Sequence, residues 1–367
     1  MLHLTLSSIS LLSLLVTKAL GACPPFNSTF FIDNSKLYPE NLDFDTQHCK
    51  LYVGSNFNAT VLVYDPYKNT QEILTFDGIS HTDPFHISGI DFDEKTGSIF
   101  ISANSGTPFV TFGQNLTGPN YLIRYDTKTK RVVYKADLAG FLTDIKDTLN
   151  LTVNGFQDMA EDHLGNSFVP VDFGVRAIAK VSPSGDVTPW YVSNDTASAN
   201  SYYPALYEGL VFHPTGKLIV TDAGAGTFVT FDTNAAPPKP RTVKISGFTS
   251  DYKGVSCDGL LNPARYPGRD VLLCSEDGIN AITVFTTKDS WKTAKYVGQV
   301  ANNNTLAAGS IPAATVQISN SLYISPFFSN DTGIADTVGN RSNFPFIDIT
   351  SSVDALVSVD NIKIADC

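Results

Sequence analysis

The sequence predicts an all-β protein: a single six-bladed β-propeller whose four-stranded blades surround a central channel. Three observations favour this fold. A strand–turn–strand pattern recurs along the chain at the spacing of propeller blades. Phenylalanine and tyrosine, which favour strands, number 24 and 15 among the 367 residues. No long segment shows the 3.6-residue hydrophobic period of an amphipathic helix.

Each repeat begins with an inner strand, followed by a tight turn and a second strand. The sequence LDFD at 42–45 returns as IDFD at 90–93, and turn-forming residues follow both. Unequal spacing between repeats predicts insertions at residues 106–119, 140–154 and 302–311. The predicted inner strands begin at Leu42, Ile90, Met159, Leu210, Val255 and near Thr315.

The first 21 residues are typical of a secretory signal peptide, which leaves residues 22–367 as one mature propeller domain. An apolar run from Leu2 to Leu20 ends in small residues suited to signal peptidase. The run is short for a membrane span, and no later segment approaches the ~20 apolar residues that a span needs. We therefore expect a secreted or secretory-lumen protein with no membrane anchor after cleavage.

Modification sites agree with the secretory interpretation. Five cysteines enter an oxidising compartment, where we expect a Cys23–Cys367 bond between the termini and a Cys257–Cys274 bond between strands, with Cys49 left over. Eight Asn-x-Ser/Thr sequences predict glycosylation in exposed loops. Their asparagines are Asn27, Asn58, Asn115, Asn150, Asn194, Asn303, Asn330 and Asn340.

The composition excludes several functional classes. The chain has 25 Lys and Arg against 36 Asp and Glu, a net charge of -11. Without a basic patch to neutralise phosphates, we expect no nucleic acid partner. The nucleophile elbow of α/β-hydrolases, the Walker phosphate loop and the His-Glu-x-x-His motif of metalloproteases are absent from the sequence.

Residues just before the inner strands are expected to converge at one rim of the channel, because every inner strand lines it. Glu208 and Lys253 could exchange a proton there, or form a structural ion pair that closes the channel. Asp158 could be a rim acid or a turn residue. The candidate catalytic residues are Lys253, Glu208, His86, Asp158 and Glu40. The candidate substrate-binding residues are Asn41, Gln157, Phe156, Tyr207 and Tyr252.

Two segments, YPEN at 38–41 and EGLVFHPTG at 208–216, resemble six-bladed propellers of the gluconolactonase and paraoxonase type. This resemblance implies a divalent cation at the rim, held by Glu and Asn side chains. The chain departs from the pattern at Lys253, which stands where a carboxylate is expected. A protonated lysine accepts no bond and repels a nearby cation. We therefore expect no metal ligands and no cofactor, with calcium as the less favoured alternative.

A more specific resemblance extends over most of the mature chain. The chain looks like a fungal secreted propeller family of secondary-metabolite clusters, which includes a trichothecene-cluster protein and the hetero-Diels–Alderases of tropolone–sesquiterpenoid clusters. The segments that carry it are LYPENLDFD at 37–45, CKLYVG at 49–54, GISH at 78–81, HISG at 86–89, NGFQD at 154–158 and TPWY at 188–191.

This resemblance implies a cofactor-free enzyme that binds apolar terpenoid or polyketide molecules and catalyses a cyclisation or cycloaddition. Lys253 and His86 would assist loss of water from a hydroxylated precursor, and Glu208, Glu40 or Asp158 would accept a proton. A sesquiterpene alkene would then add to the quinone-methide-like diene. Three alternatives stay open: a trichothecene-cluster-type biosynthetic or virulence protein, a calcium-dependent lactonase or esterase, and a non-catalytic secreted binding protein.

Overall fold

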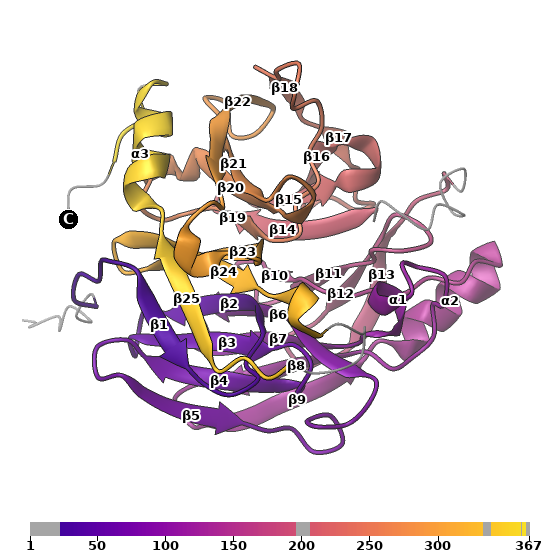
Figure 1. Cartoon of the computed structure of the whole chain (residues 1–367). Helices are drawn as coiled ribbons and strands as arrows, with labels where there is room; N and C mark the ends of the chain where they lie inside the picture. Colours follow the sequence, from indigo (N-terminus) through magenta and orange to yellow (C-terminus); the bar gives the residue numbers. More distant parts are fainter. Residues whose placement is uncertain (1–22, 196–205, 333–338, 361, 365–367) are drawn as a thin grey trace, which may run out of the picture.

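The computed structural model describes residues 23–195, 206–332, 339–360 and 362–364, so the predicted signal peptide lies outside the described residues. The strands of the described residues form six sheets arranged as a ring (Figure 1). In each sheet an inner strand lies at the centre of the ring and the strands that follow it in the chain lie farther out, while in two sheets the outermost strand comes from an earlier part of the chain. The predicted six-bladed propeller is therefore confirmed.

Blades one to three are each built from four consecutive strands. Blade one comprises β2 (Pro39–Asp45), β3 (Lys50–Ser55), β4 (Thr60–Asp65) and β5 (Thr70–Leu74). Blade two comprises β6 (Phe85–Asp93), β7 (Ser98–Ser105), β8 (Tyr121–Asp126) and β9 (Arg131–Asp137). Blade three comprises β10 (Ala160–Glu161), β11 (Ser167–Pro170), β12 (Ala177–Val181) and β13 (Val187–Val192).

The remaining blades vary the pattern. Blade four comprises β14 (Tyr207–His213), β15 (Lys217–Asp222), β16 (Thr227–Asp232) and β17 (Arg241–Thr242). Blade five comprises β19 (Leu260–Leu261), β20 (Val271–Glu276), β21 (Ala281–Thr286) and β22 (Thr293–Ala301), with β18 (Lys244–Ser246) added parallel to β22 as a fifth strand. Blade six comprises β23 (Ile311–Ile318), β24 (Ser321–Phe327), β25 (Asn343–Asp348) and β1 (Phe30–Asp33).

The N-terminal strand closes the ring. In Figure 1, β1 (indigo) runs beside β25 (yellow), and the two pair antiparallel from Phe30 opposite Phe346 to Asp33 opposite Asn343. Blade six thus takes its outer strand from one end of the chain and its other three from the far end. Hydrogen bonds between the two ends therefore hold the first and last blades together.

The hydrophobic core is divided among clusters that each fill the junction between two neighbouring blades. Alternate residues of one strand enter different clusters: in β3, Leu51 and Val53 pack toward blade six, whereas Tyr52 packs toward blade two. Both faces of such a strand are buried, which makes its sequence almost continuously apolar. These runs are the signal by which the repeats were recognised.

Short helices occupy the connections. The α-helices are α1 (Thr107–Val110), α2 (Ala139–Leu149) and α3 (Thr350–Ser358), and the first two lie in predicted insertions. Unanticipated α2 buries Phe141 and Ile145, one helical turn apart, against blades two and three. The 3₁₀ helices are η1 (Ala223–Ala225), η2 (Pro267–Arg269), η3 (Asp277–Ile279), η4 (Thr305–Ala307) and η5 (Ser329–Thr332). Among the described residues, no helix is long and apolar enough to cross a membrane.

Two disulfides are formed by the described cysteines. Cys257 and Cys274 are bonded as predicted, with their Cα atoms 5.0 Å apart. The predicted Cys23–Cys367 bond is wrong, because Cys23 is bonded to Cys49, with Cα atoms 5.6 Å apart. The chain before β1 runs along the junction of blades six and one, where Cys49 ends the β2–β3 turn. Cys367 lies outside the described residues.

The predicted glycosylation sites lie on the surface. Seven of the eight asparagines are exposed, and Asn58 is half-buried, with its Nδ2 donating to the Lys36 carbonyl oxygen at 2.9 Å. This exposure agrees with their placement in loops. Glycan occupancy itself stays a prediction.

Candidate functional site

A repeated backbone contact brings the residues before the inner strands together. Gly89, Gly209 and Gly259 each lie beside the backbone of the next blade, and a Cβ at these positions would come within 2.4, 2.9 and 2.8 Å of a carbonyl oxygen there. Any larger residue would collide with that backbone, so glycine allows the inner strands to approach closely around the channel. The side chain preceding each glycine then falls on the rim.

The polar ring at this rim is formed by Glu40, Ser88, Gln157, Glu208 and Asp258. Gln157 Nε2 donates to Asp258 Oδ1 at 2.7 Å, which joins blades three and five across the channel. The Ser88 side chain is hydrogen-bonded to Glu40. Three of the five, Glu40, Gln157 and Glu208, are candidate site residues predicted from the sequence.

Lys253 lies outside the ring, because the predicted register of blade five was wrong. The sequence predicts an inner strand that begins at Val255, whereas the inner strand β19 begins at Leu260 and pairs with β20. Lys253 is exposed on the preceding loop. The correct signal was present in the sequence, since DGL at 258–260 repeats EGL at 208–210. Asp258, which was missed, therefore supplies a carboxyl group at the position assigned to the lysine.

Carboxyl groups without basic partners dominate the rim. Among the described residues, no ion pair joins Glu40, Glu208 or Asp258 to a basic side chain. Asp172, which follows β11 and was also missed, is fully buried. Glu40 Oε2, Glu208 Oε2 and both carboxyl oxygens of Asp172 are buried without a hydrogen-bond partner. Ionising a buried carboxyl group without a hydrogen-bond partner for its oxygens costs free energy.

Burial determines the pH at which these rim carboxyl groups lose their protons. It raises the pKa of Glu40, Asp172, Glu208 and Asp258 well above the usual carboxyl range. Repulsion adds to the effect, because the Asp258 carboxylate raises the pKa of the other three further. The groups therefore hold their protons at higher pH than ordinary carboxyls. Glu40, Glu208 and Asp258 are residues of intermediate exposure, whereas Asp172 is fully buried.

Asp158 serves as a link between blades. Its Oδ1 accepts from the Met159 backbone N–H at 2.9 Å, and its Oδ2 accepts from the Leu210 N–H at 3.2 Å. Asn41 Nδ2 donates to Oδ1 at 3.4 Å from blade one. Asp158 is 6% exposed, and burial raises its pKa while the two N–H bonds lower it. The structure therefore gives Asp158, with Asn41, a positioning role among three inner strands.

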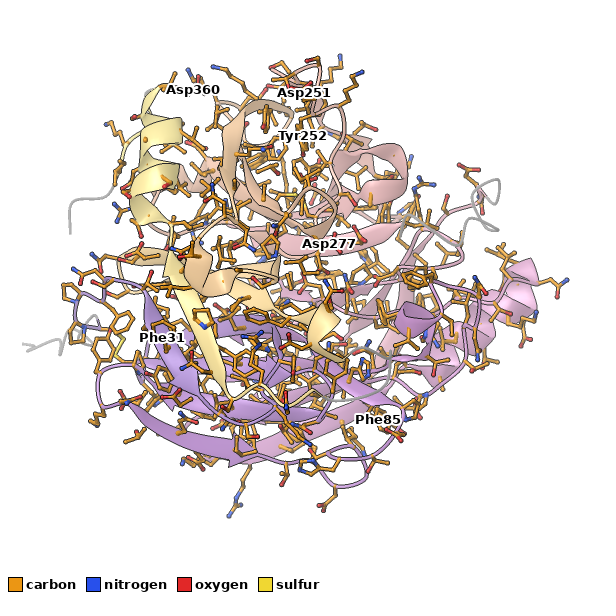
Figure 2. All side chains as sticks on the ribbon, viewed as in Figure 1. Phe31, Phe85, Asp251, Tyr252, Asp277 and Asp360 are labelled. Carbon is orange, nitrogen blue, oxygen red and sulfur yellow. A yellow bond between two sulfur atoms is a disulfide. The ribbon has the colours of Figure 1, made fainter. Side chains whose placement is uncertain are left out.

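The predicted aromatic residues lie in three different settings. Phe156 and Tyr207 are 0% and 1% exposed and pack in the junctions next to blade three, which leaves them no surface for a substrate. Tyr252, labelled in Figure 2 together with Asp277, belongs to the side chains of blade five. It is 6% exposed, and its hydroxyl donates to Glu276.

Glu276 is a buried carboxyl beside the ring that the sequence did not single out. Besides the Tyr252 hydroxyl, it accepts from Thr283 Oγ1 at 2.6 Å. Burial raises its pKa from 4.5 to about 7, although these hydrogen bonds oppose the change. Its carboxylate in turn raises the pKa of Glu208. Glu276 therefore links the ring to the interior of blade five.

His86 stands at the edge of the ring, two residues before Ser88, on an aromatic shelf. Its ring lies 5.4 Å from that of Phe57 in an edge-to-face arrangement, and Phe57 lies 5.9 Å from Phe327. All three side chains are partly exposed. The sequence did not identify Phe57, which follows the second strand of blade one, or Phe327, which ends the second strand of blade six. An apolar surface thus adjoins the polar ring.

A divalent cation matches the ring in chemistry but not in geometry. Carboxyl oxygens are calcium ligands, and the repulsion expected from Lys253 does not apply now that Asp258 occupies its position. However, no three His, Cys, Asp or Glu side chains in the described part of the chain lie close enough together to hold a metal ion. The absence of calcium stays a prediction from the sequence, because amide and backbone oxygens can also bind this ion.

The chain is similar in sequence to a fungal biosynthesis protein and in structure to a fungal allergen. It is 28% identical to "Trichothecene biosynthesis protein 14" of Trichoderma arundinaceum over 354 residues, covering 92% of each chain. The crystal structure of the major Malassezia sympodialis allergen Mala s 1 superposes with a TM-score of 0.74 at 20% identity, over 88% of this chain and 96% of that one.

A gluconolactonase of Xanthomonas campestris superposes with a TM-score of 0.51 at 12% identity, over 87% of this chain and 89% of that one, and shares the fold alone. The family model described as Mal s 1 allergenic protein-like matches residues 20–304. A match over more than half of the sequence, together with the propeller geometry, places the chain in the Mal s 1-like family.

Proposed function

We propose that the protein is a biosynthetic enzyme of fungal secondary metabolism, which promotes a dehydrative cyclisation or cycloaddition at the ring of buried carboxyl groups. The observation that carries the proposal is the set of carboxyls Glu40, Glu208 and Asp258, which have intermediate exposure and no ion pair to a basic side chain and whose pKa values burial raises. Similarity to a trichothecene biosynthesis protein supports a role in such a pathway. The two disulfides support a secretory location.

A carboxyl that keeps its proton is a general acid. Neutral Glu208 donates its proton to the leaving hydroxyl of a hydroxylated precursor, the C–O bond breaks, and water departs. The Glu208 carboxylate then accepts a proton from a second hydroxyl of the precursor, so the acid is regenerated and a neutral quinone-methide-like diene remains. The diene adds to an alkene with formation of two σ bonds and no further proton transfer. Glu40 and Asp258 donate hydrogen bonds to the oxygen atoms that gain charge.

The aromatic shelf supports the second half of this reaction. His86, Phe57 and Phe327 present partly exposed rings beside the acids. A sesquiterpene alkene packed on these rings would be held against the diene, and such orientation of two reactants is worth several kcal/mol of barrier. The partner molecules are thus apolar terpenoids and hydroxylated, tropolone-like precursors. No cofactor takes part in the proposed reaction.

The test uses the purified, glycosylated chain with a hydroxylated tropolone precursor and a sesquiterpene alkene, with products separated by chiral chromatography. We expect faster product formation and a single stereoisomer with the wild-type protein, and at least tenfold slower formation with Glu208→Gln or Asp258→Asn. Asp251→Asn, on an exposed loop outside the ring, is the matched control (Figure 2). Equal rates and product ratios with and without protein would refute the proposal.

Two alternative functions, a metal-dependent hydrolase and a non-catalytic binding protein, can be distinguished with the same purified protein. Activity on lactones that chelators abolish and calcium restores would favour a metal-dependent hydrolase. If neither cyclisation nor lactone hydrolysis occurs, a non-catalytic binding protein is favoured.

A further inference from the structure

A cavity lies inside the propeller, between the inner strands and on the side of the turns that follow them. This channel cavity has a volume of about 560 Å³, within the range of small-molecule sites. Its walls are the inner strands, and its mouth is formed by the turns that follow them, including Thr46 of blade one and His163 of blade three. Its inner end reaches Asn41 and Asp158, directly below the ring.

Buried polar atoms with unused hydrogen-bonding capacity line this cavity. Asn262 Oδ1, Thr315 Oγ1 and Glu161 Oε2 are buried without a hydrogen-bond partner, and their residues are 4%, 6% and 7% exposed. They come from three different blades, so one bound molecule could contact all of them. A folded protein rarely leaves such groups unsatisfied, which points to water or a ligand between them.

Arg269 adds a cation at the mouth of the cavity. Its side chain is partly buried, and its Nη1 donates to the Asn262 carbonyl oxygen. Among the described residues, no carboxylate lies within ion-pair distance of it. The guanidinium has five N–H donors, so donors remain available to a ligand oxygen.

The acids in the cavity do not make it a site for cations. Burial raises the pKa values of the neighbouring Asp43, Asp91 and Glu161, and the charge of Asp91 raises those of Asp43 and Glu161 further, so the three carry less negative charge than their number suggests. Phe44 and Phe92 contribute apolar surface to the same walls. Aromatic surface beside mixed donors and acceptors suits a hydroxyl-rich molecule, because each hydroxyl both donates and accepts while its C–H bonds pack on the rings.

We propose that the channel cavity is a binding site for a neutral polyol or monosaccharide, whose hydroxyl groups donate to Asn262 and Glu161 and accept from Arg269. This site is separate from the carboxyl ring and does not depend on the function proposed there.

The test is calorimetric titration of the purified full chain with sorbitol and with D-glucose. We expect saturable one-site binding, weakened at least threefold by Thr315→Val and at least tenfold by Arg269→Met. Thr221→Val is the matched control, because it also removes a buried, unpaired hydroxyl but lies outside the cavity. Glu208→Gln should bind both molecules like the wild type, which separates this site from the ring.

Several results would overturn the assignment. The proposal fails if neither molecule saturates the protein, or if Thr221→Val weakens binding as much as Thr315→Val does. Tighter binding of D-gluconate or D-glucosamine than of the neutral compounds would show that the site selects a charge. Circular dichroism of each variant confirms that a loss of binding is not a loss of fold.

Discussion

Glu276 contributes to the pH dependence of the stability of the fold, and Glu276→Gln should remove that contribution. Burial raises its folded-state pKa from 4.5 to about 7. A raised pKa means that the folded state prefers the protonated form, so this stabilisation is present at low pH and lost as pH rises through 7. At 1.36 kcal/mol per pKa unit, the loss between pH 5 and pH 8 is about 2.5 kcal/mol.

Glutamine keeps the acceptor oxygen for Tyr252 and Thr283 but cannot ionise. In urea unfolding followed by fluorescence, Glu276→Gln should match the wild type within about 1 kcal/mol at pH 5 and exceed it by about 2–3 kcal/mol at pH 8. Glu72→Gln is the control, since Glu72 is a half-exposed carboxylate paired with Lys130 at 2.6 Å. A Glu276→Gln variant that loses stability between pH 5 and pH 8 as steeply as the wild type would refute the reasoning.

Three further predictions concern the fold around the site. Replacing both Cys23 and Cys49 by serine should lower the free energy of unfolding by about 3–4 kcal/mol, given their separation of 26 residues; an unchanged urea midpoint would contradict this. Gly89→Ala places a Cβ 2.4 Å from a backbone oxygen of the next blade and should lower the melting temperature, whereas Gly140→Ala, with open space around it, should not. Asp158→Ala leaves two buried backbone N–H groups unpaired and should cost about 2–4 kcal/mol, measurable by urea unfolding; a loss below about 0.5 kcal/mol would mean that water replaces the carboxylate.

The propeller could be read from the sequence because each blade is a local unit. Its strands follow one another through short turns, and burial of both strand faces gives every repeat the same apolar pattern. The same locality made the Cys257–Cys274 bond predictable, as both residues belong to one blade. Contacts that close the ring have no local signature. Cys23 therefore could not be matched to Cys49, because only the pairing of β1 with β25 brings the N-terminal segment beside blade one.

The candidate site could also be predicted only in part from the sequence. The sequence by itself determined that the residues before the inner strands share one rim, and it placed Glu40, Gln157 and Glu208 there. Only the tertiary structure decided that Asp258 completes this ring while Lys253 faces solvent, because a two-residue strand such as β19 leaves too little apolar pattern to fix its register. It also decided the protonation of the ring, since pKa values depend on burial and on charges from other blades, which converge only once the ring is closed.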